Sequence, residues 1–139
     1  MEPILKYKNR DKLYQFLIDN FGLIKVKEHY DKKFFGNFYI LLSSTDFLLS
    51  YINDRGFIDI HISSKLDTNN FFSLSFIQNF IYDPNHINSN KFSNNEHRID
   101  SLNKFLQKDF YKISELFNEE NYFQTKKKID SLLESQFNT

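Results

Sequence analysis

Cysteine is absent from the 139 residues of this chain. Its absence excludes disulfides, thiolate catalysis, and zinc or iron–sulfur sites with cysteine ligands. Small secreted domains often depend on disulfides, so we expect a reducing, cytoplasmic environment. Glycine is also scarce, at 3 residues. So few glycines supply no Walker loop, no dinucleotide-binding turn and no Gly-x-Ser-x-Gly nucleophile turn.

The chain also lacks long apolar runs. No stretch approaches the roughly 20 apolar residues that cross a bilayer. The N-terminus has no apolar core and no small-residue cleavage site, so it does not read as a signal peptide. We therefore expect no membrane partner.

Neither sign of charge is in excess. Lys and Arg number 18, as do Asp and Glu, and the isoelectric point is near 6.9. General binding to nucleic acid needs a clustered positive surface, so no nucleic-acid partner is expected. Residues 126–128 are the one run of three lysines. Three consecutive residues spread over about 200° of a helix, which indicates solvated helix surface rather than a phosphate site.

Aromatic side chains are what the chain has in abundance, with 17 Phe and 8 Tyr. Each buries roughly 150–250 Å² when it is packed in a core. The chain length is also typical of one domain. We therefore expect a single folded domain over residues 1–139.

The hydrophobic periodicity predicts an α+β fold: an N-terminal helix, a four-stranded antiparallel meander, and three C-terminal helices packed on the sheet. The first helix is expected at residues 9–20, capped by Asn9 and ended by Gly22. A capping box of Ser93 and Glu96 is expected to start the long helix. The expected strands are 23–29, 36–42, 47–52 and 57–63, and the expected later helices are 71–82, 93–117 and 119–136.

The turn between the last two strands predicts their register. A two-residue turn of Arg55 and Gly56 would force Arg55 to a positive φ, which arginine disfavours. A three-residue loop, 54–56, needs positive φ only at Gly56. This loop pairs Ile52 with Ile58, Ser50 with Ile60, and Leu48 with Ile62. The opposite face then carries Phe47, Leu49, Tyr51, Phe57, Asp59 and His61.

The second and third strands are apolar on both faces. Either helices cover both faces of the sheet, or part of one face is exposed as a protein interface. Tyr and Arg are favoured at the centres of interfaces. The first candidate surface is therefore Tyr51, Asp54, Arg55, Asp59 and His61. An acidic helix junction of Glu115, Glu119 and Glu120 is the second, and the last two of these carboxylates are expected in the first turn of a helix.

Two groups of residues have both a chemical and a simpler interpretation. Asp59 and His61 lie two residues apart on one strand, a geometry that suits an acid–base pair. Outward polar residues on an alternating strand explain the pair more simply. The four histidines, which have no i, i+4 spacing, leave open a metal site assembled with carboxylates in three dimensions. We predict no enzyme activity, no catalytic residue, no metal and no cofactor.

The segments 35–40 and 51–56 resemble the middle of small bacterial proteins, some of which are similar to immunity proteins of polymorphic or contact-dependent toxin systems. The resemblance covers residues 10–82 and has no diagnostic motif. It implies a stoichiometric inhibitor that binds a cognate toxin and occludes its active site. Inhibitors of nucleases are often acidic, and this neutral chain departs from that pattern. Immunity proteins vary in fold, so no binding residue follows from the resemblance.

Two other hypotheses stay open beside a non-enzymatic, immunity-like binder. One is a small enzyme or ligand-binding domain with a pocket between sheet and helices. The other is a structural subunit of a larger assembly, which would show a large apolar surface.

Overall fold

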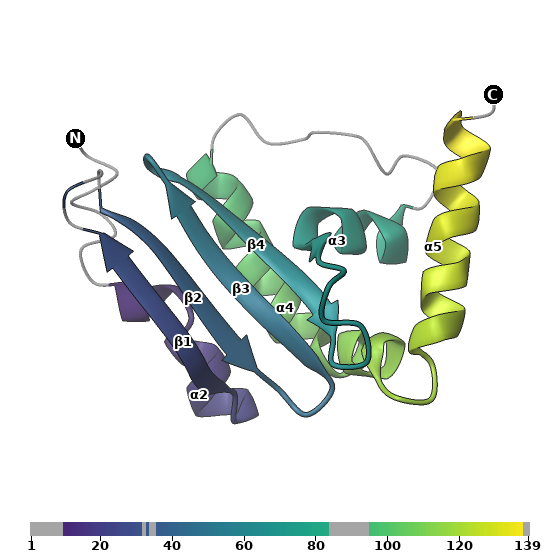
Figure 1. Ribbon diagram of the computed structural model, residues 1–139, viewed down its shortest axis with the longest axis horizontal. Helices are drawn as coiled ribbons and strands as arrows, with labels where there is room; N and C mark the ends of the chain where they lie inside the picture. Colours follow the sequence, from purple (N-terminus) through teal and green to yellow (C-terminus); the bar gives the residue numbers. More distant parts are fainter. Residues whose placement is uncertain (1–9, 32, 34–35, 84–94, 138–139) are drawn as a thin grey trace.

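The fold is that of a computed structural model. The residues that the structure describes are 10–31, 33, 36–83 and 95–137. The helices and the antiparallel sheet confirm the α+β class (Figure 1). The described elements are η1 (Arg10–Leu13), α2 (Gln15–Phe21), β1 (Ile24–Asp31), β2 (Asn37–Ser43), β3 (Phe47–Asp54), β4 (Phe57–Ser64), β5 (Phe72–Ser73), α3 (Leu74–Tyr82), α4 (Asn95–Phe117) and α5 (Tyr122–Phe137). The sheet has five strands in the order β1-β2-β3-β4-β5 rather than four. The additional strand, β5, is short and pairs with the end of β4 immediately before α3.

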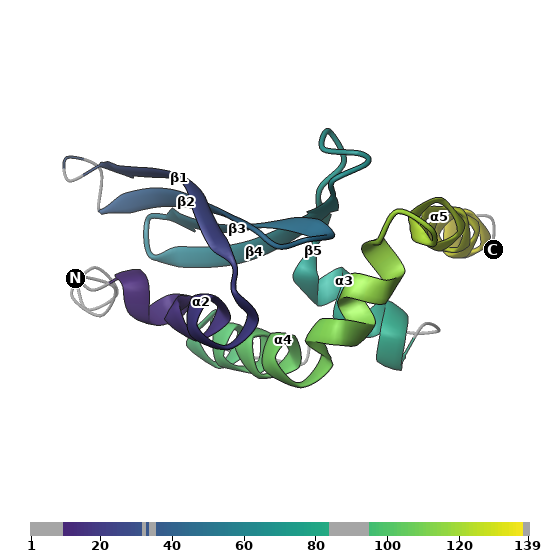
Figure 2. The same ribbon diagram turned by 90° about the horizontal axis from the view of Figure 1, so that it is seen from below.

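The helices that cover the sheet lie on one side of it (Figure 2). Helices α2, α3 and α4 pack beneath the strands; we call this side the inner face and the opposite side the outer face. No helix of the described ranges covers the outer face. Helix α5 packs against α4 and stands to one side of the strands. The expectation that all three C-terminal helices pack on the sheet is therefore wrong for α5.

The hydrophobic core lies between the inner face and helices α2, α3 and α4. Alternate residues of the three central strands point into it, as the two-residue period of a strand requires. These inner-face residues are Phe38, Ile40, Leu42, Phe47, Leu49, Tyr51, Ile58, Ile60 and Ile62, all nearly or fully buried. From α4, Ile99, Leu102, Leu106 and Ile113 complete the same core.

The N-terminal helix is shorter than predicted. A 3₁₀ turn, η1, precedes α2, and Tyr14 between them has non-helical angles of φ −132° and ψ 0°. The predicted C-terminal cap is confirmed, because Gly22 has φ 71° and its N–H donates to the Ile18 carbonyl at 3.1 Å. A left-handed residue of this kind is usually glycine, which has no Cβ to clash. Asn9, the predicted N-terminal cap, lies outside the described residues.

The predicted β3–β4 register is wrong by one residue. Asn53 is opposite Ile58, Tyr51 opposite Ile60 and Leu49 opposite Ile62. Arg55 and Gly56 form a two-residue turn with φ values of 56° and 89°. A slip of one residue exchanges the two faces of a strand, so β3 directs Phe47, Leu49 and Tyr51 inward.

Side-chain amides explain why the turn tolerates a strained arginine. The Asn37 Oδ1 atom accepts a hydrogen bond from the Arg55 N–H at 2.7 Å, and the Asn53 Oδ1 atom accepts one from the Gly56 N–H at 3.0 Å. The Asn53 side chain also donates to the Gly36 carbonyl at 3.0 Å. Together with the burial of three large inward side chains, these bonds outweigh the roughly 1–2 kcal/mol cost of a left-handed residue that is not glycine.

We expect Arg55→Asn to raise the free energy of unfolding by about 0.5–1 kcal/mol, because Asn-Gly is a favoured pair in such turns. Urea denaturation at neutral pH measures the change. The side chain of Arg55 is 79% exposed, so the substitution removes little packing. An unchanged or lower stability would show that Arg55 is not strained in the turn.

The later helices differ from prediction at their starts. Helix α3 begins at Leu74 rather than at 71, because residues 72–73 pair with β4. Helix α4 ends at Phe117 as predicted, and its regular geometry is interrupted at Asp109 (φ −113°, ψ 19°), whose carboxylate accepts a hydrogen bond from the Tyr82 hydroxyl at 2.5 Å. Helix α5 begins at Tyr122, so Glu119 and Glu120 lie in the turn before it and not in its first turn. Ser93 of the predicted capping box lies outside the described residues.

Candidate functional site

Three rows of side chains cross the outer face of the sheet. Residues directly opposite each other in antiparallel strands project from the same face, so the register defines each row. Starting from the β3–β4 turn, the rows are His29, Tyr39, Ile52 and Asp59, then Lys27, Leu41, Ser50 and His61, then Ile24, Ser43, Leu48 and Ser63.

Of the six central residues of these rows, on β2 and β3, four are apolar and two are serines, Ser43 and Ser50. Tyr39, Leu41, Leu48 and Ile52 form what we call the outer apolar cluster, and each is half-buried. The β1 rim beside the cluster is more open, with Ile24 68% and Val26 58% exposed. The Lys27 ammonium lies 5.9 Å from the centre of the Tyr39 ring and gives this side of the cluster a positive charge.

One end of the outer face is bordered by the segment between β4 and β5. Residues 65–71, between β4 and β5, rise above the outer face in Figure 2. Ser63 lies in the row next to this segment and is fully buried. The first row, nearest the β3–β4 turn, holds no buried residue, whereas the second row includes Ser50, which is 2% exposed. The first row is therefore the more open part of the face.

A polar network borders the cluster on the β4 side. Asp59 accepts a hydrogen bond from the Arg98 guanidinium of α4 at 3.0 Å, and its second carboxylate oxygen lies 3.0 Å from the His61 Nε2 atom. The Arg98 side chain is only 15% exposed and lies 4.9 Å from the centre of the Phe57 ring. It also donates to the Ile58 carbonyl and, at 3.3 Å, to the Ser75 hydroxyl. Arg98 thus fastens α4 to the edge of β4.

The chemistry of Asp59 follows from these partners. Burial raises the pKa of its carboxyl group, but the hydrogen bonds from His61 and Arg98 more than offset burial, and the net pKa is lowered. Asp59 is therefore a carboxylate whose two oxygens are already engaged by Arg98, His61 and the Ile60 N–H. This arrangement favours the simpler interpretation of the Asp59–His61 pair, as polar residues that organise a strand edge.

The edge of β4 is closed by side chains rather than by another long strand. The Asn95 amide, at the start of α4, accepts from the Ile58 N–H at 2.8 Å and donates to the Ile58 carbonyl at 2.8 Å, as a neighbouring strand would. Farther along, the Asp59 carboxylate accepts from the Ile60 N–H at 3.0 Å, and β5 pairs with Ile62. An unpaired edge is a template for unwanted strand pairing, and these contacts block it.

The structure separates the residues predicted as the first candidate surface. Asp59 and His61 project together from the outer face, and Asp54 and Arg55 occupy the adjoining turn with exposed side chains. Tyr51 is fully buried on the inner face, so the prediction that it lies on the exposed side of the sheet is wrong. The cause is the one-residue register error. Tyr39, which sequence reasoning did not select, is the tyrosine that the outer face presents.

The second candidate surface lies at the opposite end of the molecule from the β3–β4 turn (Figure 1). Glu115, Glu119 and Glu120 are all exposed around the turn between α4 and α5. Asn121 holds this turn by donating to the Glu115 carbonyl at 3.0 Å and, through its backbone N–H, to the Asn118 side chain at 2.8 Å. The acidic junction is thus an ordered turn, remote from the outer apolar cluster.

The described part of the chain has neither a cluster of metal-binding side chains nor a membrane-spanning helix. In residues 10–31, 33, 36–83 and 95–137, no group of three or more His, Asp or Glu side chains is placed to hold a metal ion. None of the helices in those ranges is long and apolar enough to cross a membrane. His86 lies outside the described residues.

No protein family model matches this sequence, and neither a curated protein nor a solved structure matches the chain.

Proposed function

We propose that this chain is a non-enzymatic protein-binding domain whose partner docks on the outer face of the sheet. The supporting observation is the outer apolar cluster, which occupies the middle of the face although no described helix covers it. Contiguous apolar surface rimmed by polar groups marks interaction sites on monomeric proteins. A tyrosine in the cluster and charged groups at its rim match the composition of protein interfaces.

Charge on the rim suggests how a partner is oriented. Lys27 and His29 border the cluster on β1, whereas Asp59 borders it on β4 beside His61 and Arg98. Rim charges of this kind set association rate and register more than affinity. The binding free energy is then expected to come from Tyr39, Leu41 and Ile52.

We propose further that the partner is a bacterial toxin which this domain inhibits by stoichiometric binding. This part of the proposal comes from the resemblance of segments 35–40 and 51–56 to proteins similar to immunity proteins. Segment 35–40 leads into β2, which carries Tyr39 of the cluster, and segment 51–56 includes Ile52.

The outer face is tested with charged substitutions. We expect Leu41→Asp and Ile52→Asp each to weaken partner binding by about 100-fold or more, because a buried unpaired carboxylate would be left in the interface. The tagged chain is first used to capture partners from source cells, and a stoichiometric partner is identified among them. Calorimetry then compares the affinity of that partner for each variant. Circular dichroism confirms that the variants are folded, and Tyr39→Ala tests the same surface without adding charge.

The matched control is Lys104→Asp, an exposed residue of α4 away from the sheet. It should leave affinity unchanged. Equal affinity of all four variants would place the interface elsewhere, and the acidic junction of Glu115, Glu119 and Glu120 would be tested next.

The toxin proposal has its own readout: expression of the partner alone should arrest growth, and co-expression of the unmodified chain, but not of Ile52→Asp, should restore it. A harmless partner would contradict the toxin proposal and leave the binding proposal intact.

A further inference from the structure

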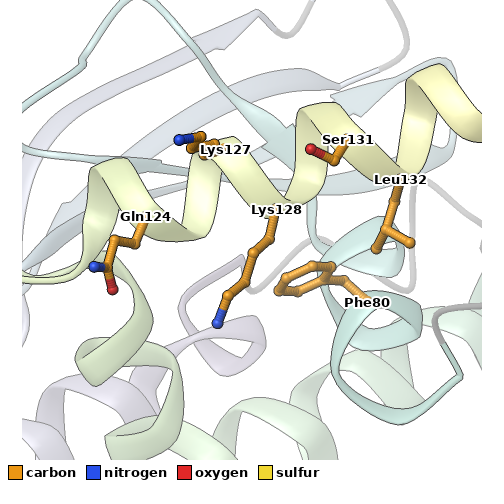
Figure 3. A pocket seen from close by; sticks show the side chains of 6 residues that line it. All are labelled: Phe80, Gln124, Lys127, Lys128, Ser131 and Leu132. Atoms are coloured by element: carbon orange, nitrogen blue, oxygen red, sulfur yellow. The ribbon is translucent and has the colours of Figure 1, made fainter.

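A second concave surface lies between α3 and α5, away from the outer face. It is an open groove of about 790 Å³ lined by Phe80, Gln124, Lys127, Lys128, Ser131 and Leu132. Figure 3 shows Leu132 of α5 projecting toward α3, and the Phe80 ring of α3 lying beside the extended Lys128 side chain. The groove therefore has an apolar end and a cationic, hydrogen-bonding remainder.

The charge of the groove has one sign. Two of its six lining residues are lysines and none is acidic. Helix α3 carries no charged residue over 74–82, so this wall adds no counter-charge. On α5, the Asp130 carboxylate already accepts a hydrogen bond from Lys126 at 3.0 Å, and neither residue lines the groove. An occupant with negative charge is complementary to this lining.

The length of the groove indicates the kind of occupant. From Gln124 to Leu132 the lining spans nine residues of helix, or eight steps of 1.5 Å, which is about 12 Å. An extended peptide covers that distance with about four residues at roughly 3.3 Å each. Gln124 and Ser131 are spaced along this path and can each bond to a peptide backbone, since both carry donors and acceptors.

We propose that the groove between α3 and α5 binds an acidic peptide segment of a protein partner through one large apolar side chain. The apolar side chain packs between Phe80 and Leu132, and carboxylates on either side of it pair with Lys127 and Lys128. This site is separate from the outer apolar cluster and does not depend on the function proposed for that cluster.

The first test maps binding by NMR on the full chain labelled with ¹⁵N. The probe is the blocked peptide Asp-Glu-Phe-Glu-Asp, and the control peptides are Asp-Glu-Ser-Glu-Asp and Lys-Lys-Phe-Lys-Lys. We expect the probe to shift the amide signals of α3 and of residues 124–132 of α5, and we expect neither control to do so. Shifts spread over other elements, or equal shifts with the serine control, would overturn the proposal.

A charge exchange tests the assigned lysines. Both are exposed, so Lys127→Glu/Lys128→Glu should fold normally. We expect this double variant to bind the acidic probe about tenfold more weakly and to gain binding to Lys-Lys-Phe-Lys-Lys. The matched control, Lys12→Glu/Lys104→Glu, changes the net charge equally at exposed positions outside the groove and should bind the probe normally. Equal loss of probe binding in both double variants would show a general charge effect and contradict the site.

If dodecanoate shifts the same amides and no peptide does, the occupant is a small amphiphilic anion and the peptide proposal is wrong.

Discussion

Tyr51→Ala is expected to lower the free energy of unfolding by about 4 kcal/mol, within the range for removing a large aromatic side chain from a core. Tyr51 is fully buried in the middle of β3, and its ring centre lies 5.9 Å from that of Tyr14. Its hydroxyl donates to the Asn103 Oδ1 atom at 2.8 Å, and the Asn103 amide in turn donates to the Leu13 carbonyl at 3.2 Å. Tyr51 therefore joins the sheet to α4 and, through Asn103, to η1. Urea denaturation followed by circular dichroism measures the loss.

Two further variants separate the contributions to this loss of stability. Tyr51→Phe keeps the ring and removes the hydroxyl, so it should cost only about 1 kcal/mol, the usual value of one hydrogen bond. Tyr39→Ala removes a half-buried tyrosine from the outer face and should also cost no more than about 1 kcal/mol. If Tyr39→Ala were as destabilising as Tyr51→Ala, another part of the chain would have to cover the outer face, and the proposed interface would be lost.

The general architecture is readable from the sequence because local signals agree with it. Alternating apolar residues in 57–63 and the 3.6-residue period of 93–117 predict strand and helix, and both are found. Short polar turns between the strands predict antiparallel pairing, which is also found. Strand β5 could not be predicted, because two residues are too few for a period and its pairing depends on the position of β4.

The register error shows where a local rule fails. Arginine disfavours positive φ, so the turn alone favoured the three-residue loop. The observed turn is stabilised by amides of Asn37 and Asn53, and Asn37 lies on a different strand from the turn. The Asn37 contact depends on tertiary structure, and no pattern within residues 53–57 reveals it. The resulting slip moved Tyr51 to the wrong face in the prediction.

The candidate site was predictable only in part. Strands with apolar residues on both faces indicated that one face could be an interface, but the sequence does not say which face the helices cover. The closure of the β4 edge was missed altogether. Asn95 and Arg98 reach Ile58 across 37 and 40 residues of sequence, and an Asn or Arg near a helix start carries no signal for such a contact.

Loss of the Asp59–Arg98 contact is expected to cause the second large decrease in stability. Asp59→Asn is expected to lower the free energy of unfolding at pH 7 by about 2 kcal/mol, between the small value of an exposed ion pair and the larger cost of leaving a buried charge unpaired. Asp59 is 31% exposed, which keeps the effect below that of a fully buried pair. Lys126 and Asp130, an i,i+4 pair at 3.0 Å whose carboxylate side chain is 57% exposed, offer the matched control: Asp130→Asn should cost less than about 0.5 kcal/mol.

The effect of Asp59→Asn should depend on pH with a definite sign. The pKa of Asp59 is lower in the folded state than the value near 3.9 expected for an unfolded chain. Its stabilising contribution is therefore complete above about pH 4 and is lost as the pH falls through the folded-state pKa. Urea denaturation between neutral and strongly acidic pH should show the parent chain and Asp59→Asn converging in stability below about pH 4. Repeating the series in a His61→Gln background retains the Arg98 contact and separates its contribution from that of His61. A stability difference that stays constant through the acidic range would mean that the Asp59 carboxylate is not held by Arg98 and that α4 is fastened to β4 chiefly through Asn95.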